Sequence, residues 1–517
     1  MKPIPTHDVI VVGSGAAGGW VAKELTQRGA SVLLLDAGPT EMTNAGTLTY
    51  EQARARQPVQ SRCYAYDERT RPFFVDDIDN PYVTPRGRPF QWIRSRTVGG
   101  RMRLWARYCL RMSDLDFHAA RHDGQGEDWP IGYADLAPYY DRVERFLQVT
   151  GTAEGLPLLP DGRLAERLDL TPTERRLRNV LSQKWPDRRL VAPRMALRGH
   201  EHVLQAAAST GRLTLRANAV VGHVLLDRSQ KKATGVAFVD RLTHAEVEAR
   251  SRAVVLCAST IESTRILLDS KSARHSSGLA NSSGVLGHYL MDHTSGIELL
   301  GIDPHTRPEG EEQALRFMTC SHIPRFRNLV DRHPRFRRGY GCYVSVPREA
   351  HAVQSDALKR LLSAARAEDR TPFNMWCFGE VLPRFENQVT LAPETRDAWG
   401  NPAVRIDCTY SENEMAMADD AAHSLAEMAQ AAGFSIMDRS TALRPPGTSI
   451  HELGTARMGL DPRTSVLNPF NQSWDIPNLF VTDGSCFVSG GCQNPTLTIM
   501  ALSARAAEYL ATHIQGF

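Results

Sequence analysis

The sequence lacks the cysteine spacings that mark disulfide frameworks and metal centres. Its nine cysteines are an odd number scattered along 517 residues, and no two of them form a CxxC pair. Structural zinc sites and cysteine-ligated iron–sulfur clusters depend on such close spacings. We therefore expect reduced, mostly buried thiols, no bound metal and a cytoplasmic protein, because reducing compartments keep thiols unpaired.

A strong charge of one sign is also absent. The chain has 61 Lys and Arg against 58 Asp and Glu, a net charge of +3, and the basic residues are spread out. A nucleic-acid-binding domain usually shows a basic stripe with a recognisable motif, so we expect no such partner. No apolar run approaches the roughly 20 residues of a membrane-spanning helix. Residues 1–7 show no signal-peptide pattern, and we expect none.

What the sequence does contain begins with a strand–turn–helix–strand unit. The β-branched run from Asp8 to Val12 predicts a strand that is buried on both faces. A glycine-rich turn over residues 13–18 follows, then a helical stretch, and residues 31–35 predict a second strand that ends at Asp36. This order is the βαβ unit of dinucleotide-binding folds.

The glycine-rich turn has a physical role in holding a pyrophosphate. Gly13 permits the tight turn out of the strand, Gly15 lets the backbone approach the phosphates, and Gly18 lets the helix pack closely on the sheet. The helix N-terminus presents free N–H groups and a partial positive charge to the phosphates. A carboxylate at Asp36 suits a ribose hydroxyl.

FAD and NAD both use this turn, and the C-terminal part of the chain favours FAD. Residues 478–485 predict a buried strand that ends at Asp483 and Gly484, and residues 493–498 open the last helix. A helix N-terminus beside an isoalloxazine ring stabilises the reduced, anionic flavin through its dipole. We therefore expect both ends of the chain to contribute to one flavin site.

With these motifs in place, the sequence resembles the glucose–methanol–choline (GMC) oxidoreductases nearly from end to end. The likeness is carried by residues 13–18 with Asp36, then by residues 97–101, 254–259, 262–267 and 286–293, and above all by the block from His451 to Pro462 and on to Arg505. Within the family, residues 113–117, 128–131, 135–140 and 492–496 are most similar to the bacterial pyranose oxidases, glucoside 3-dehydrogenases and C-glycoside 3-oxidases.

The resemblance implies an α/β fold. We expect a Rossmann-type FAD-binding domain of the GMC and p-hydroxybenzoate hydroxylase type, formed by residues 1–290 and 446–517, with an irregular excursion over residues 39–95 that serves as a lid or as packing. Residues 291–445 are expected to form a sheet-containing α+β substrate-binding domain. The residues expected to contact FAD are Gly13, Gly15, Ala16, Ala17, Gly18, Asp36, Ala37, Gly99, Gly100, Arg101, Trp105, Val221, Ala258, Asp483, Gly484, Asn494, Pro495 and Thr496.

The resemblance also implies a catalytic pair near flavin N5, which maps to His451 and Asn494. The chemistry supports these residue types, because removing hydride from a carbinol carbon requires a base for the hydroxyl proton. A neutral imidazole accepts that proton near pH 7, and an amide beside it orients the substrate oxygen.

Some members of the family attach FAD covalently through a histidine just before the tryptophan that corresponds to Trp105. Leu104 occupies that position here, and a leucine is no nucleophile. We therefore predict non-covalent FAD. The bulky and charged residues 106–108 that follow depart from the family's small-residue pattern, which leaves open how oxygen or another acceptor reaches the flavin.

Alternation along a predicted strand places Trp376, Phe378 and Glu380 on one face, a row that suits a sugar. A core tryptophan with a surface glutamate is the simpler explanation of the same pattern. The first hypothesis is FAD-dependent oxidation of a secondary alcohol of a sugar or glycoside, with oxygen or another electron acceptor. The alternatives are a non-sugar alcohol or a lyase reaction, and the flavin subunit of a membrane-linked dehydrogenase complex.

The candidate protein partners are a second copy of this chain, in a homo-oligomer, and a small accessory subunit.

Overall fold

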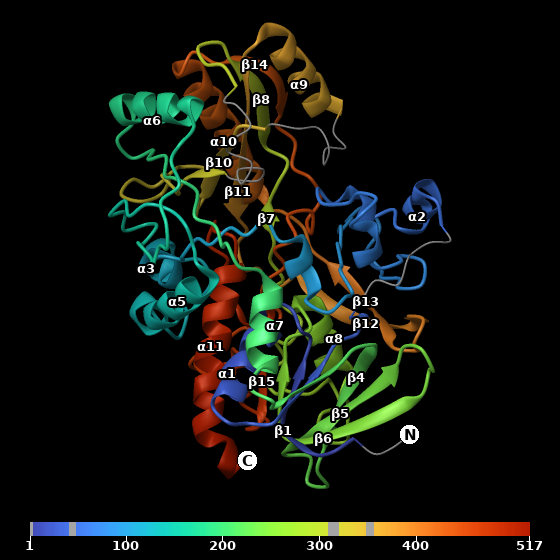
Figure 1. Cartoon of the computed structure of the whole chain (residues 1–517). Coiled ribbons are helices and arrows are strands. Elements are labelled where there is room, and N and C mark those ends of the chain that lie inside the picture. The colour runs from blue at the N-terminus through green and yellow to red at the C-terminus, as the bar shows by residue number, and fades with distance from the viewer. Residues whose placement is uncertain (1–3, 41–47, 309–319, 348–355) are drawn as a thin grey trace.

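The computed structural model of the protein describes residues 4–40, 48–308, 320–347 and 356–517. Within these residues, two large β-sheets lie at opposite ends of the molecule, and the chain crosses between them several times (Figure 1). The predicted fold class, a Rossmann-type α/β sheet with a second, sheet-containing α+β part, is confirmed.

The first sheet is built around parallel strands from three distant parts of the chain. The strand order is β3-β2-β1-β6, and β15 adds to the free side of β6. These strands are β1 (His7–Val12), β2 (Val32–Leu35), β3 (Leu213–Arg216), β6 (Glu246–Leu256) and β15 (Leu479–Val481). The most buried strands, β2 and β15, are apolar throughout, as parallel strands covered on both faces must be. The pairing of β15 with β6 brings the C-terminal block beside the N-terminal βαβ unit.

Helices from both ends of the chain cover this sheet. The helix α1 (Ala16–Gln27) packs against α11 (Thr496–His513) and α7 (His200–Ala208), and α11 also packs against α5 (Tyr133–Leu147). Beyond the parallel strands, the N-terminal half of β6 pairs antiparallel with β5 (Ala233–Asp240), which pairs with β4 (Ala219–Leu226). The long strand β6 therefore joins a parallel sheet to an antiparallel one.

The second sheet is antiparallel, with the order β14-β8-β11-β10-β9 and with β7 also paired to β11. One face is covered by α10 (Glu412–Ala431), whose alanines and methionines pack on the strands. On the other face, α9 (Asp356–Glu368) covers only the end near Leu300 and Ile302. The strands are β7 (His293–Thr294), β8 (Glu298–Asp303), β9 (Ser321–Ile323), β10 (Tyr340–Ser345), β11 (Thr371–Glu380) and β14 (Ser435–Ser440).

The remaining elements connect the two sheets. The helix α6 packs against α10, whereas α8 contacts the two-stranded sheet formed by β12 and β13. The predicted excursion contains, in its described part, the short α-helix α2 and two single-turn 3-10 helices, and it is otherwise largely irregular; residues 41–47 lie outside the described part. No helix in the described ranges has the length and apolar character needed to cross a bilayer. These elements are α2 (Tyr50–Arg56), α3 (Asp114–Phe117), α4 (Ala119–Asp123), α6 (Pro172–Lys184), α8 (Thr260–Asp269), β12 (Gln388–Arg396) and β13 (Pro402–Asp407).

Candidate active site

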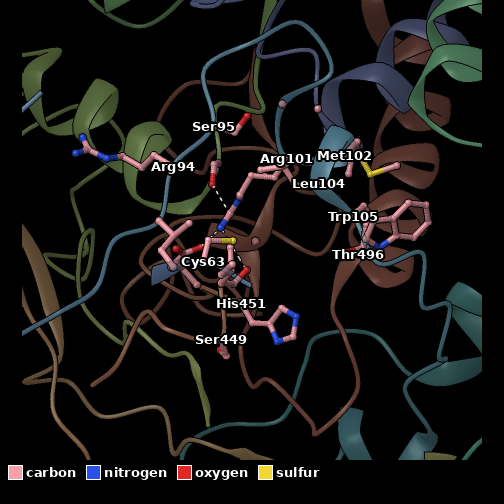
Figure 2. Close-up of a pocket in the computed structure, with 18 of the residues that line it drawn as sticks. Cys63, Arg94, Ser95, Arg101, Met102, Leu104, Trp105, Ser449, His451 and Thr496 are labelled. Atoms are coloured by element: carbon pink, nitrogen blue, oxygen red, sulfur yellow. Dashed lines mark hydrogen bonds and ion pairs between the residues drawn. The ribbon is translucent and has the colours of Figure 1, made fainter. Parts of the chain in front are cut away.

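A cavity of about 1620 Å³ lies between the two sheets and receives residues from both ends of the chain. Figure 2 shows Arg101, Trp105, His451 and Thr496 around it. Of the residues expected to contact FAD, the cavity is lined by Gly13, Gly15, Ala16, Ala17, Asp36, Ala37, Gly100, Arg101, Trp105, Val221, Ala258, Asp483, Gly484, Asn494, Pro495 and Thr496. The structure therefore brings together nearly the whole predicted set.

Two of the residues expected to contact FAD, Gly18 and Gly99, do not line the cavity. Each must be a glycine because a side chain would clash with a neighbouring group. A Cβ at Gly18 would lie 1.8 Å from the carbonyl oxygen of Gly13, so the absence of a side chain lets α1 pack against the turn. A Cβ at Gly99 would lie 2.3 Å from the ring of His200. Both glycines support the walls of the cavity without facing it.

The turn itself is shaped for close approach by a ligand. Gly13 has a φ of +95°, which a residue with a side chain rarely adopts, and a Cβ there would lie 2.4 Å from the Cys257 carbonyl oxygen. At Gly15, by contrast, the nearest atom to an added Cβ is 3.9 Å away, so this glycine leaves open space in front of the N-terminus of α1. An anionic group placed there would meet the positive end of the helix dipole.

Asp36 is buried and is held by the turn that precedes it. Its carboxylate accepts hydrogen bonds from the Ser14 amide at 3.0 Å, the Ser14 hydroxyl at 2.5 Å and the Gly38 amide at 2.8 Å. Burial raises the pKa of Asp36, and these hydrogen bonds oppose that rise. Ser14 also accepts from the Gly99 amide, so it ties the glycine-rich turn to residues 97–101; its position inside the motif was the only sequence signal for this role.

Asp483, just after the end of β15, is buried and hydrogen-bonded in the same way as Asp36. It accepts from the hydroxyls of Ser263 at 2.5 Å and Ser485 at 2.6 Å, and burial raises its pKa. Ser263 lies on α8, so the C-terminal strand is tied to the helix that follows β6. The two acidic residues therefore sit on opposite sides of β1 and β6, each in a hydrogen-bonded corner that borders the cavity.

The cavity fits a large dinucleotide on two structural grounds. First, its volume exceeds the 300–1,000 Å³ typical of a site for one small molecule. Second, several lining side chains bear buried polar atoms that have no hydrogen-bond partner within the described protein: Trp105 Nε1, Arg94 Nε, Ser95 Oγ and Glu452 Oε1. Buried polar atoms are rarely left unsatisfied, so their clustering around one cavity indicates a polar ligand.

His451 is placed by a buried carboxylate. Asp292 accepts hydrogen bonds from the backbone amides of His451 at 3.0 Å and Gly447 at 2.7 Å, and from the Ser449 hydroxyl. Between these anchors, Ile450 has a φ of +63°, a left-handed conformation that is strained for a β-branched residue. A strained backbone conformation persists only where surrounding contacts hold it, and here the hydrogen bonds to Asp292 do so. The conformation of Ile450 sets the direction of the His451 side chain.

The imidazole of His451 is oriented by a second histidine, His293. Their Nδ1 atoms are 2.9 Å apart, and His293 Nε2 lies 2.9 Å from the Gly491 carbonyl oxygen. A carbonyl only accepts, so we assign the proton of His293 to Nε2 and a lone pair to its Nδ1. His451 then donates from Nδ1, which leaves the lone pair of its Nε2 directed toward Asn494.

Asn494 is oriented in the same manner by Tyr343 of β10. The Tyr343 hydroxyl donates to Asn494 Oδ1 at 2.7 Å, which turns the amide nitrogen toward His451 Nε2 at 3.2 Å. An amide N–H and an imidazole lone pair thus face each other at the edge of the cavity. Tyr343 carried no sequence signal, whereas His293 belongs to the family-like stretch 286–293 but received no predicted role.

Burial lowers the pKa of both histidines. For His451 the lowering is large, with further contributions from His293 and from the positive charge of Arg101. The pKa of His293 is lowered by burial, opposed by its hydrogen bond to Gly491 and by the charge of Glu380. Both rings are therefore neutral near pH 7, the state in which His451 Nε2 accepts a proton.

The predicted substrate row is only partly brought to the cavity. Trp376 and Phe378 line it, and the Phe378 and His451 rings lie 5.2 Å apart. Glu380 does not line the cavity and is a correction to the prediction: it is 1% exposed and pairs with Arg338 Nη1 at 3.1 Å. Arg338 also pairs with Asp123 at 2.6 Å, and a buried carboxylate requires such a partner.

Within the residues that the structure describes, no three His, Cys, Asp or Glu side chains are grouped so as to hold a metal ion. The nine cysteines are all buried. The polar groups that border the cavity include imidazole, amide, hydroxyl, guanidinium and carboxylate groups, beside the thiols of Cys63, Cys257, Cys320 and Cys377.

Comparisons with known proteins agree with this geometry. The N-terminal and C-terminal models of the GMC oxidoreductase family match residues 197–295 and 383–503. A 2-methyl-1,2-propanediol dehydrogenase from Mycolicibacterium austroafricanum is 32% identical over 98% of this chain and 95% of its own length. A C-glycoside 3-oxidase from Microbacterium trichothecenolyticum is 25% identical over 98% of this chain and 97% of its own.

The fold is also similar to a solved structure of pyridoxine 4-oxidase from Mesorbium loti. That match has a TM-score of 0.66 and 17% identity, and it covers 98% of this chain and 99% of the other. FAD is the cofactor typical of the family to which the matching models belong. With its fold, its cavity and its full-length relatives, this chain belongs to the GMC oxidoreductase family, whose members are flavin enzymes that act on the CH–OH group of alcohols.

Proposed function

We propose that the protein oxidises a secondary alcohol of a sugar or glycoside to a ketone, with non-covalently bound FAD. The observation that carries the reaction type is the set of hydrogen bonds that leaves the His451 Nε2 lone pair facing the Asn494 amide at the cavity edge. When bound, FAD supplies the acceptor for the hydride that leaves the carbinol carbon.

His451 accepts the hydroxyl proton of the substrate at Nε2. Its low pKa keeps it neutral, and its hydrogen bond to His293 keeps the lone pair on the side of the cavity. A substrate hydroxyl that contacts both residues takes the place of the Asn494 amide at the Nε2 lone pair, so that it donates to the imidazole and accepts from the amide. The proton and the hydride thereby leave the same C–O–H unit toward different acceptors, which avoids an unstable cation or alkoxide.

A sugar is favoured by the wall of the cavity opposite the glycine-rich turn. Trp376 and Phe378 offer apolar ring faces, and Ser295, which is 7% exposed, has a hydroxyl without a hydrogen-bond partner in the described structure. Sugar rings combine apolar C–H faces with hydroxyl groups, which suits such a wall. The similarity to a C-glycoside 3-oxidase supports this substrate class.

A small aliphatic alcohol is the second candidate, because the chain is 32% identical to a 2-methyl-1,2-propanediol dehydrogenase. A substrate of that size would leave the polar Ser295 hydroxyl and much of the Trp376 ring without a contact. The test is a panel of pyranoses, glycosides and short diols, mixed anaerobically with the purified yellow protein while flavin absorbance is followed. Bleaching by sugars at rates well above those for diols supports the proposal, and the reverse order replaces it with the diol.

Non-covalent binding of FAD rests on the residue that stands before Trp105. Leu104 lines the cavity at that position, and its alkyl side chain has no nucleophilic atom to bond the flavin. Acid precipitation should release all the flavin into the supernatant. Yellow colour that stays with the precipitated polypeptide would contradict this part of the proposal.

A further inference from the structure

The cavity continues beyond the catalytic pair along one face of β11. Phe378, Trp376 and Asn374 alternate onto that face, and all three line the cavity. Four residues of strand rise about 13 Å, which is longer than a single pyranose ring. The row therefore leads from His451, beside Phe378, to a part of the cavity that a one-ring substrate does not reach.

The far end of this row has polar walls supplied by the neighbouring strands. Glu298 of β8 lies opposite Trp376, and Ser345 of β10 lies opposite Asn374, and both line the cavity. Asn374 Oδ1 is buried and has no hydrogen-bond partner in the described structure. Leu358 of α9 also lines the cavity, and α9 covers the end of the sheet face near Leu300, the residue opposite Asn374.

We propose that Glu298, Ser345 and Asn374 form a distal subsite for a second, hydroxyl-bearing ring, so that the substrate is a glycoside with a hydroxylated aglycone or second sugar. This inference rests on the proposed oxidation of sugars. The unpartnered atom is an acceptor, and Glu298 adds two more acceptor oxygens, so the subsite fits a ligand rich in O–H donors. Carboxylates and phosphates offer no donors for these atoms.

The local charges and rings agree with a neutral, ring-shaped ligand. Arg444 lies 3.7 Å from Glu298, so the wall has one positive and one negative group and no net attraction for an ion. Trp376 stacks on Tyr343 with ring centroids 5.5 Å apart and an interplanar angle of 11°. Because Tyr343 also holds Asn494, the tryptophan is a rigid platform between the reacting end and the distal subsite.

The experiment compares glucose, methyl glucoside, hexyl glucoside and cellobiose as reductants of the bound flavin, with affinities measured separately by calorimetry on the oxidised holoenzyme. We expect cellobiose to have the highest kcat/KM. We expect Asn374→Ala to lower kcat/KM for cellobiose about tenfold, mostly through KM, because a hydrogen bond to a buried acceptor is lost. Glucose should change less than twofold, and Asn374→Asp should retain most of the cellobiose activity.

Asn179→Ala, on the exposed side of α6, is the matched control and should behave as the wild type with every sugar. Equal losses for glucose and cellobiose in Asn374→Ala would overturn the distal subsite and leave the proposed sugar oxidation intact. A preference for hexyl glucoside over cellobiose would also overturn it, because the far end would then favour an apolar group. Wild-type protein that neither binds nor is reduced by any of the four would overturn both proposals.

Discussion

His293 and His451, which are 158 residues apart in the chain, form a direct contact between their Nδ1 atoms at 2.9 Å. One ring lies on β7, at the start of the antiparallel sheet, and the other lies on the loop that leads back to the first sheet. The contact fixes which nitrogen of His451 faces the cavity. His293 is therefore a positioning residue: it acts on the reaction through the tautomer of its neighbour.

Replacing His293 tests this role directly. In His293→Ala, His451 loses the acceptor for its Nδ1 proton, so part of the population carries the proton on Nε2 and cannot act as a base. We expect the rate constant of flavin reduction to fall at least tenfold. In His293→Asn, the amide oxygen takes the place of the lost acceptor and the rate should recover. Stopped-flow reduction measures both, and equal rates in the two variants would argue against control of the tautomer.

The pH dependence of flavin reduction follows from the neutral state of His451. The rate constant has its maximum value where the imidazole is neutral, and it falls as the pH drops through the pKa of His451. Burial holds that pKa well below 6.5, so the rate should stay flat from pH 8 down to pH 6.5 and fall only at more acidic values. An inflection between pH 6.5 and 8 would contradict the lowered pKa. In His293→Ala one cause of the lowering is removed, and the acid limb should move to higher pH.

The variant His451→Ala separates chemistry from cofactor binding. The protein should remain yellow, because Asp36, Asp483 and the glycine-rich turn do not depend on this side chain. Flavin reduction should slow by about 10²–10⁴-fold, the usual contribution of a general base. A variant that reduces its flavin at the normal rate would remove His451 from the mechanism.

The glycine-rich turn allows a test of cofactor binding that does not involve activity. In Gly18→Ala, the added Cβ meets the Gly13 carbonyl oxygen, so α1 must shift away from the turn. The ratio of flavin to protein absorbance should fall markedly in the purified variant. Gly19→Ala is the matched control, because Gly19 also lies in α1 and the nearest atom to an added Cβ there is 3.4 Å away, an ordinary contact. Equal flavin content in Gly18→Ala and wild type would argue against this packing role.

Arg338 should matter for stability because it is fully buried between two carboxylates. In Arg338→Ala, Glu380 and Asp123 lose their partner inside the protein, which costs about 3–5 kcal/mol. The melting temperature of the FAD-bound protein should drop by several degrees. Arg335→Ala removes an exposed arginine from its pair with Asp419 and should leave the melting temperature nearly unchanged. Similar melting temperatures for both variants would contradict the role given to the buried pair.

The local elements were predictable because their signals are local. The strand over residues 8–12 appears as His7–Val12, the strand over residues 31–35 as Val32–Leu35, and the last helix, which residues 493–498 were expected to open, as Thr496–His513. Buried apolar runs and glycine-rich turns constrain the backbone wherever they occur, so they can be recognised without knowledge of the neighbouring strands. The same holds for Asp36 and Asp483, each of which ends a buried strand.

Side-chain partners were not predictable in this way. Alternation correctly placed Trp376 and Phe378 on one face of β11. It gave no sign that Glu380, two residues further along, forms an ion pair with Arg338. A charge near the end of a strand is solvated in most proteins, whereas this one is buried and paired with Arg338, which also pairs with Asp123 of α4. Tyr343 became important only through its pairing opposite Trp376 and its reach to Asn494.

The sequence by itself determined a dinucleotide turn at one end, a strand and helix that return to it at the other, and a histidine and an asparagine as the candidate pair. The tertiary structure alone decided that His293 orients this histidine, that Tyr343 orients the asparagine, and that Glu380 pairs with Arg338 instead of lining the cavity. The physical reason is range: periodicity and turn chemistry act over a few residues, whereas the direction of a hydrogen bond depends on which strands the fold places side by side.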